Sequence, residues 1–144
     1  MSVGVVVITH GQLAAELLNA AEMIVGDLPT FAAVSIGWHE DVDQAREAIA
    51  QAIGRVRASA GDAPDAPSGV LLLSDMFGGT PANLAVTFLE AGRVEVITGV
   101  NLAMLIKLAR PQREQDLLTL ARDMREHGRN AIWVASDLLR GEKG

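Results

Sequence analysis

Short apolar runs alternate along this chain with longer segments of helical spacing, and this alternation limits the fold more than any other feature. We interpret four runs as buried strands: residues 3–8, 31–36, 70–73 and 94–97. Helical spacing follows each run, over residues 13–26, 42–56, 81–90 and 101–109, and again over 117–128. Parallel neighbours in a sheet need crossover connections, which are usually helices. The order therefore predicts an α/β fold with an open, mostly parallel four-stranded sheet and helices on both faces.

The remaining segments set the expected boundaries of the domain. A length of 144 residues is typical of one domain, and we assign residues 1–140 to it. Residues 61–69, rich in Pro, Ala and Asp, are predicted to be a loop and the main site of disorder. Residues 131–135 are interpreted as a last strand, and residues 141–144 as a frayed tail.

Composition excludes several classes of function. The chain has no cysteine, so disulfides, thiol catalysis and thiolate metal sites are impossible. A net charge of −6 argues against a general nucleic-acid or membrane-surface role and favours a partner with a basic face. Neither a signal peptide nor an apolar stretch of about 18 residues is recognisable, which predicts a cytoplasmic protein.

Two candidate catalytic residues, His10 and Asp75, follow the first and third apolar runs. Loops at the carboxyl ends of parallel strands share one edge of a sheet, so we expect the two side chains to meet. A hydrogen bond from one ring nitrogen to the carboxylate would fix the tautomer and leave the other nitrogen as a nucleophile. This arrangement suggests reversible phosphorylation of His10.

Further residues at the same edge suit a phosphoryl group. A helix start offers free backbone N–H groups, glycines let the backbone approach closely, and Thr80 adds a hydroxyl. The expected phosphoryl-binding residues are Gly11, Gly78, Gly79, Thr80 and Asn101. Each also has a structural interpretation: Thr80 and Asn101 are typical helix N-caps, and an Asp before two glycines is typical of a turn. We interpret His39 as a loop residue and His127 as a residue of a helix C-terminus.

The ordered motifs resemble the mannose-type IIA component of the bacterial phosphoenolpyruvate-dependent sugar phosphotransferase system. The similarity runs over nearly the whole chain. The motifs are VVVITHG (residues 5–11), AEM (21–23), LSDMFGGTP (73–81) and TGVNLAML (98–105).

The resemblance implies a phosphoryl relay without metal or organic cofactor. His10 would accept phosphate from the phosphohistidine of the carrier HPr and pass it to a IIB component, which would be separate because the chain stops at Gly144. Asp75 would orient the ring, and the Thr80 hydroxyl would hold phosphoryl oxygens. The family also implies a homodimer in which residues 131–135 form a C-terminal strand added antiparallel to the partner's sheet, and contact with the membrane only through the IIC/IID permease.

Alternatives stay open within the class of histidine phosphocarriers. These are a regulatory phosphocarrier that serves no transporter, and the phosphoryl donor of dihydroxyacetone kinase. Other classes fit less well: a receiver domain would need acids after the first strand, and a nucleotide-binding domain would need a glycine-rich fingerprint. A metal hydrolase using His10, His39 and Asp75 lacks a close pair of ligands.

Overall fold

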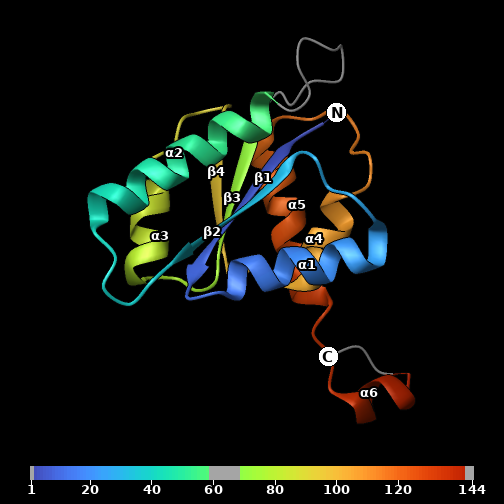
Figure 1. The fold of residues 1–144 in the computed structure, drawn as a ribbon. Helices are drawn as coiled ribbons and strands as arrows, with labels where there is room; N and C mark the ends of the chain where they lie inside the picture. The colour runs from blue at the N-terminus through green and yellow to red at the C-terminus, as the bar shows by residue number, and fades with distance from the viewer. Residues whose placement is uncertain (1, 59–68, 142–144) are drawn as a thin grey trace.

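Strands and helices alternate through the first four strand–helix pairs, as the apolar pattern predicts, and two further helices follow. The computed structural model describes residues 2–58 and 69–141 (Figure 1). The strands are β1 (Gly4–His10), β2 (Phe31–Ile36), β3 (Val70–Ser74) and β4 (Val94–Thr98). The helices are α1 (Leu13–Val25), α2 (Val42–Ala58), α3 (Gly79–Val86), α4 (Leu102–Leu108), α5 (Leu117–Asn130) and α6 (Ala135–Leu139).

The strands form a sheet in the order β2-β1-β3-β4, and every neighbouring pair is parallel. The prediction of a four-stranded parallel sheet is thereby confirmed. Because β1 and β3 are adjacent, the loops that follow them are neighbours as well. Ile8 of β1 pairs with Ser74 of β3, so the segments that follow these two strands leave the sheet almost side by side.

Successive residues of the strands pack against two separate helical layers, because side chains alternate across a pleated strand. Val5 and Val7 belong to the cluster under α1, α4 and α5, whereas Val6 and Ile8 belong to the cluster under α2 and α3. Figure 1 shows these two layers on opposite sides of the sheet. Helices on both faces were predicted, and the two cores explain why β1 is apolar at nearly every position.

The boundaries of several elements differ from the prediction. Strands β1, β3 and β4 continue one or two residues further, through His10, Ser74 and Thr98, because parallel pairing satisfies the backbone of these polar residues too. Helix α3 begins at Gly79 and ends at Val86, not at residues 81 and 90. The predicted loop 61–69 lies outside the described residues except for Gly69, as does the predicted tail beyond Gly141.

The predicted last strand is not formed in the single chain. Ala131 continues the helical backbone of α5 as its C-cap, residues 132–134 pair with no described strand, and Ala135 begins α6. A strand needs a neighbour to receive its backbone hydrogen bonds, and this segment runs away from the sheet (Figure 1). The assignment of residues 1–140 to one domain stays a prediction.

None of the helices in the described part of the chain is both long and apolar enough to cross a membrane.

Candidate functional site

The last residue of β1, His10, contacts the first residue after β3, Asp75. The ring Nδ1 lies 2.7 Å from Asp75 Oδ2, and the His10 backbone N–H donates to the same oxygen at 3.0 Å. The ring is half-exposed, with 52% of the side chain accessible, whereas Asp75 exposes only 13%. His10 and Asp75 are 65 positions apart in sequence, and they meet at the sheet edge as the sequence predicted. Two groups of His10, the ring Nδ1 and the backbone N–H, contact the same carboxylate oxygen of Asp75.

The charge of Asp75 determines which ring nitrogen carries the proton. Burial raises the pKa of this carboxyl, but hydrogen bonds from the His10 ring and backbone outweigh burial, so the pKa lies below the ordinary value of 3.8. At neutral pH Asp75 is then an acceptor only, and Nδ1 must donate. A lowered pKa adds folding stability above pH 3.8 that is lost as the pH falls through the folded-state pKa.

The other ring nitrogen, Nε2, faces the start of α3. Gly78 is the N-cap, and Gly78 and Gly79 both have positive φ, at 85° and 82°. A Cβ built on Gly79 would lie 3.1 Å from Cε1 and 3.2 Å from Nε2 of His10. Two left-handed residues in a row and this close approach both require glycine. The backbone of α3 therefore lies directly against the unpaired side of the ring.

The remaining predicted phosphoryl-binding residues differ in their positions. Thr80 is exposed in the first turn of α3, so it is not the N-cap, which is Gly78. Gly11 follows His10 directly with a φ of 56°, in the turn that leads into α1.

Asn101 is placed in a helix cap. Its Oδ1 accepts from Met104 N at 3.1 Å, and its Nδ2 donates to Gly128 O at 3.0 Å, which joins α4 to α5. Both of its polar groups are thus engaged away from His10 and Asp75. The N-cap interpretation is confirmed, and we leave Asn101 out of the proposed phosphoryl site.

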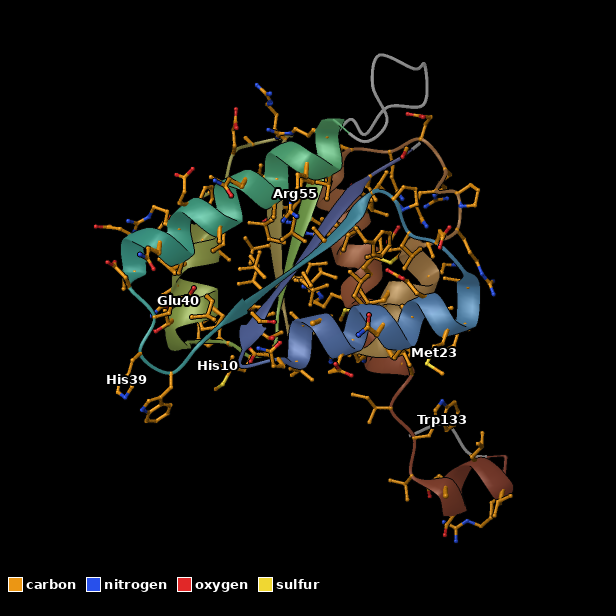
Figure 2. All side chains as sticks on the ribbon, in the orientation of Figure 1. His10, Met23, His39, Glu40, Arg55 and Trp133 are labelled. Atoms are coloured by element: carbon orange, nitrogen blue, oxygen red, sulfur yellow. The ribbon has the colours of Figure 1, made fainter. Side chains whose placement is uncertain are left out.

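The two other histidines lie apart from this pair. Figure 2 shows His39 beyond the end of β2, pointing away from the molecule, whereas His10 lies at the sheet edge. The His39 ring packs edge-on against Trp38, with centroids 6.0 Å apart. His127 lies in the last turn of α5. Within residues 2–58 and 69–141, no three His, Cys, Asp or Glu side chains are grouped so that they could hold a metal ion.

Two hydroxyls that sequence reasoning did not single out border the site. Thr9 and Ser74 immediately precede His10 and Asp75, and both side chains are fully buried. The sequence signal that could have identified them is a polar residue at the last buried position of an otherwise apolar strand.

The fold and the site together define a class: an α/β protein with a parallel sheet that presents a histidine paired with an aspartate beside a glycine-rich helix start. The family model described as "PTS system fructose IIA component", EIIA-man, matches residues 4–124. The chain belongs to this family. Membership places it among phosphotransferase-type proteins and supports a phosphocarrier role in a sugar phosphotransferase system.

Individual relatives agree with the family assignment. The mannose-specific EIIAB component of Escherichia coli K12 is 33% identical over 109 residues, which are 74% of this chain but only 31% of that protein. The chain thus matches about a third of the length of that relative. The fructose-specific EIIA component of Bacillus subtilis is 28% identical over 138 residues, covering 95% of this chain and 89% of that protein.

A solved structure is similar in fold and sequence. The mannose/sorbose specific IIA subunit from Enterococcus faecalis superimposes with a TM-score of 0.72 at 30% identity, over 93% of this chain and 95% of that one.

Proposed function

We propose that this protein accepts a phosphoryl group on Nε2 of His10 from phosphorylated HPr and passes it to a IIB component. The proposal rests on one observation. Asp75 Oδ2 lies 2.7 Å from Nδ1 of His10, while Nε2 of the same ring faces the glycine backbone at the start of α3. With Nδ1 protonated, the lone pair of the neutral imidazole is on Nε2. The nucleophile thus points to the place where an anion is best received.

The chemical step exchanges one phosphorus–nitrogen bond for another. The Nε2 lone pair of His10 forms the new bond while the bond to the donor's histidine breaks, and the electron pair returns to that donor nitrogen. The His10 ring gains positive charge, which the carboxylate of Asp75 offsets through Nδ1. Transfer to the acceptor reverses these changes, so no proton has to leave Nδ1.

The start of α3 would hold the phosphoryl oxygens. The first N–H groups of a helix have no partner within the helix, and the dipole favours negative charge there. In α3 these donors come from Gly79 and Thr80, since Pro81 has no N–H. The Thr80 hydroxyl would add a further donor.

Exposed apolar side chains support a protein as the partner rather than a small molecule. Trp38 is 92% exposed and Phe77 is 86% exposed, in the loops after β2 and β3. The end of β1, with His10, lies between these strands in the sheet order. Large exposed aromatics beside a reactive group are typical of protein interfaces.

Transfer between purified proteins tests the proposal. With phosphoenolpyruvate, enzyme I and HPr, the chain should gain one acid-labile, base-stable phosphate, and a IIB component should remove it. A chain that stays unlabelled while HPr itself is phosphorylated would contradict the proposed function.

Replacing Asp75 by Asn should slow phosphorylation by on the order of 100-fold, because an amide can donate to Nδ1 and shift the ring proton to the nucleophilic nitrogen. The initial rate of labelling by phosphorylated HPr measures this effect. Asp116→Asn is the matched control: Asp116 also has a pKa lowered by hydrogen bonds, but it caps α5. Equal rates for Asp75→Asn and the wild type would remove Asp75 from the mechanism.

We propose, in addition, that the chain forms a homodimer through residues 132–134. Ile132 and Val134 in this extended segment are 76% and 66% exposed. Strand β4 is at an edge of the sheet, and a cavity of about 260 Å³ lies between β4 and α5. Exposed apolar side chains and an unpaired sheet edge are complementary, because a strand from a second copy satisfies both.

Sedimentation of the full chain tests this assembly. Ile132→Asp combined with Val134→Asp should convert a dimer into a monomer, since two charges would have to be buried at the joined edge. Leu139→Asp, at an 88% exposed position of α6, should leave the dimer intact. A monomeric wild type, or a dimer that survives the double change, would contradict the proposal.

A further inference from the structure

The core contains two hydroxyl side chains that the relay described above does not use. Thr9 and Ser74 are the polar side chains that the described residues bury completely, in an interior otherwise made of aliphatic groups. Each occupies the position before a site residue, Thr9 before His10 and Ser74 before Asp75. Burying a hydroxyl is costly unless it is hydrogen-bonded, so the bonds that these two make indicate what they do.

Thr9 fixes the turn between β1 and α1. Its Oγ1 accepts from Ala14 N at 2.6 Å, whereas the N-cap residue Gln12 makes no side-chain cap bond. Thr9 therefore caps α1 from within the strand. This bond spans the turn that contains His10, whose backbone N–H donates to Asp75 Oδ2.

Ser74 does the same for the loop after β3. Its Oγ donates to Met76 O at 3.1 Å, and Met76 N in turn donates to Asp75 Oδ1 at 3.1 Å. The Ser74 carbonyl accepts from both Gly99 N and Val100 N at 2.9 Å, which ties the loop to the end of β4. One oxygen of Asp75 is thus oriented by its own loop, and the other is left for His10.

We infer that Thr9 and Ser74 are positioning residues that hold the His10–Asp75 pair in the tautomer and orientation required for phosphoryl transfer. The inference rests on the proposed function of His10. The two hydroxyls act on opposite sides of the sheet, Thr9 toward α1 and Ser74 toward the loop that leads to α3. Between them they restrain the two backbone segments that carry His10 and Asp75, so that the backbone N–H and the ring Nδ1 of His10 both meet Asp75 Oδ2.

Transfer rates of hydroxyl-deleted variants test this inference. Thr9→Val, which keeps the shape, and Ser74→Ala should each slow labelling of His10 by phosphorylated HPr by about tenfold or more, because small misplacements of reacting groups are costly. Thr9→Ser retains the acceptor and should restore most of the rate. If Thr9→Val and Thr9→Ser label equally fast, the hydroxyl has no positioning role.

A matched control separates positioning from a general loss of stability. Thr87 Oγ1 donates to Leu84 O at 2.6 Å near the end of α3, a comparably short bond at the opposite end of that helix from Gly79. Thr87→Val should lower the melting temperature like the other variants but label at the wild-type rate. Equal slowing in Thr87→Val and Thr9→Val would overturn the inference.

Nitrogen NMR of the His10 ring gives a readout that needs no phosphate. In the wild type, Nδ1 of His10 should carry the proton, and in Thr9→Val and Ser74→Ala a larger share should move to Nε2. His39 and His127 serve as internal references in the same spectra. An unchanged tautomer ratio in both variants contradicts the inference even if the wild type is phosphorylated, and an unlabelled wild type contradicts the proposed function instead.

Discussion

His10→Ala is expected to abolish phosphorylation completely. Nε2 of His10 is the only proposed nucleophile, so the variant lacks the nitrogen to which the phosphoryl group can be transferred. The change should leave the fold intact, because the ring is 52% exposed and packs into neither core. Labelling by phosphoenolpyruvate, enzyme I and HPr measures the loss, and circular dichroism checks the fold.

The chain offers two natural controls for this experiment, since it contains three histidines in all. His39→Ala and His127→Ala should label at the wild-type rate, because neither ring is paired with a carboxylate at the sheet edge. Normal labelling of His10→Ala would show that phosphate resides elsewhere and would end the proposal.

Gly79→Ala is expected to reduce phosphorylation by on the order of 100-fold, through a contact that the sequence pattern alone does not reveal. The new Cβ would lie 3.2 Å from Nε2, so either the ring or the start of α3 must move. In both cases the nucleophile loses its approach to the backbone N–H groups. The φ of +82° adds about 1–3 kcal/mol of backbone strain for any residue with a Cβ.

Gly92→Ala separates the steric effect from the strain. Gly92 has a similar φ of 75°, and nothing lies within 4 Å of a Cβ built there. Both variants should lose a similar amount of stability in urea, but only Gly79→Ala should lose phosphorylation. If the two variants label alike, the close approach of Gly79 to His10 has no part in the reaction.

Local information in the sequence was sufficient to predict the four strands and helices α1 to α5, but not α6. The apolar run of β1 and the helical spacing of α1 depend on residues close in sequence, so they can be recognised without a structure. The meeting of His10 and Asp75 followed from one general property of parallel sheets, that all carboxyl ends lie at one edge. The family motifs added the chemistry expected of that pair.

The features that differ from the expectations, or were added to them, involve contacts between distant segments. Asn101 was expected both at the phosphoryl site and as an N-cap; the structure shows the cap, together with a bond from its amide to Gly128 in α5 that no local pattern could indicate. Residues 131–135 form no strand in the single chain, which offers no neighbouring strand there, and the dimer proposed above would supply one. Helix α3 begins at Gly79, two residues earlier than predicted, and Gly78 and Gly79 have positive φ, with Gly79 close to the His10 ring.

The periodic spacing of apolar side chains thus determined by itself that this chain builds strands and helices in alternation, because each element depends on its own few residues. Tertiary structure alone decided the strand order β2-β1-β3-β4, the ring nitrogen that contacts Asp75, and the hydrogen bonds that the buried hydroxyls of Thr9 and Ser74 make next to that pair. The features of the site are hydrogen bonds whose lengths matter to tenths of an ångström, and the strand order depends on which distant segments pair. They arise only when segments far apart in the chain are packed together.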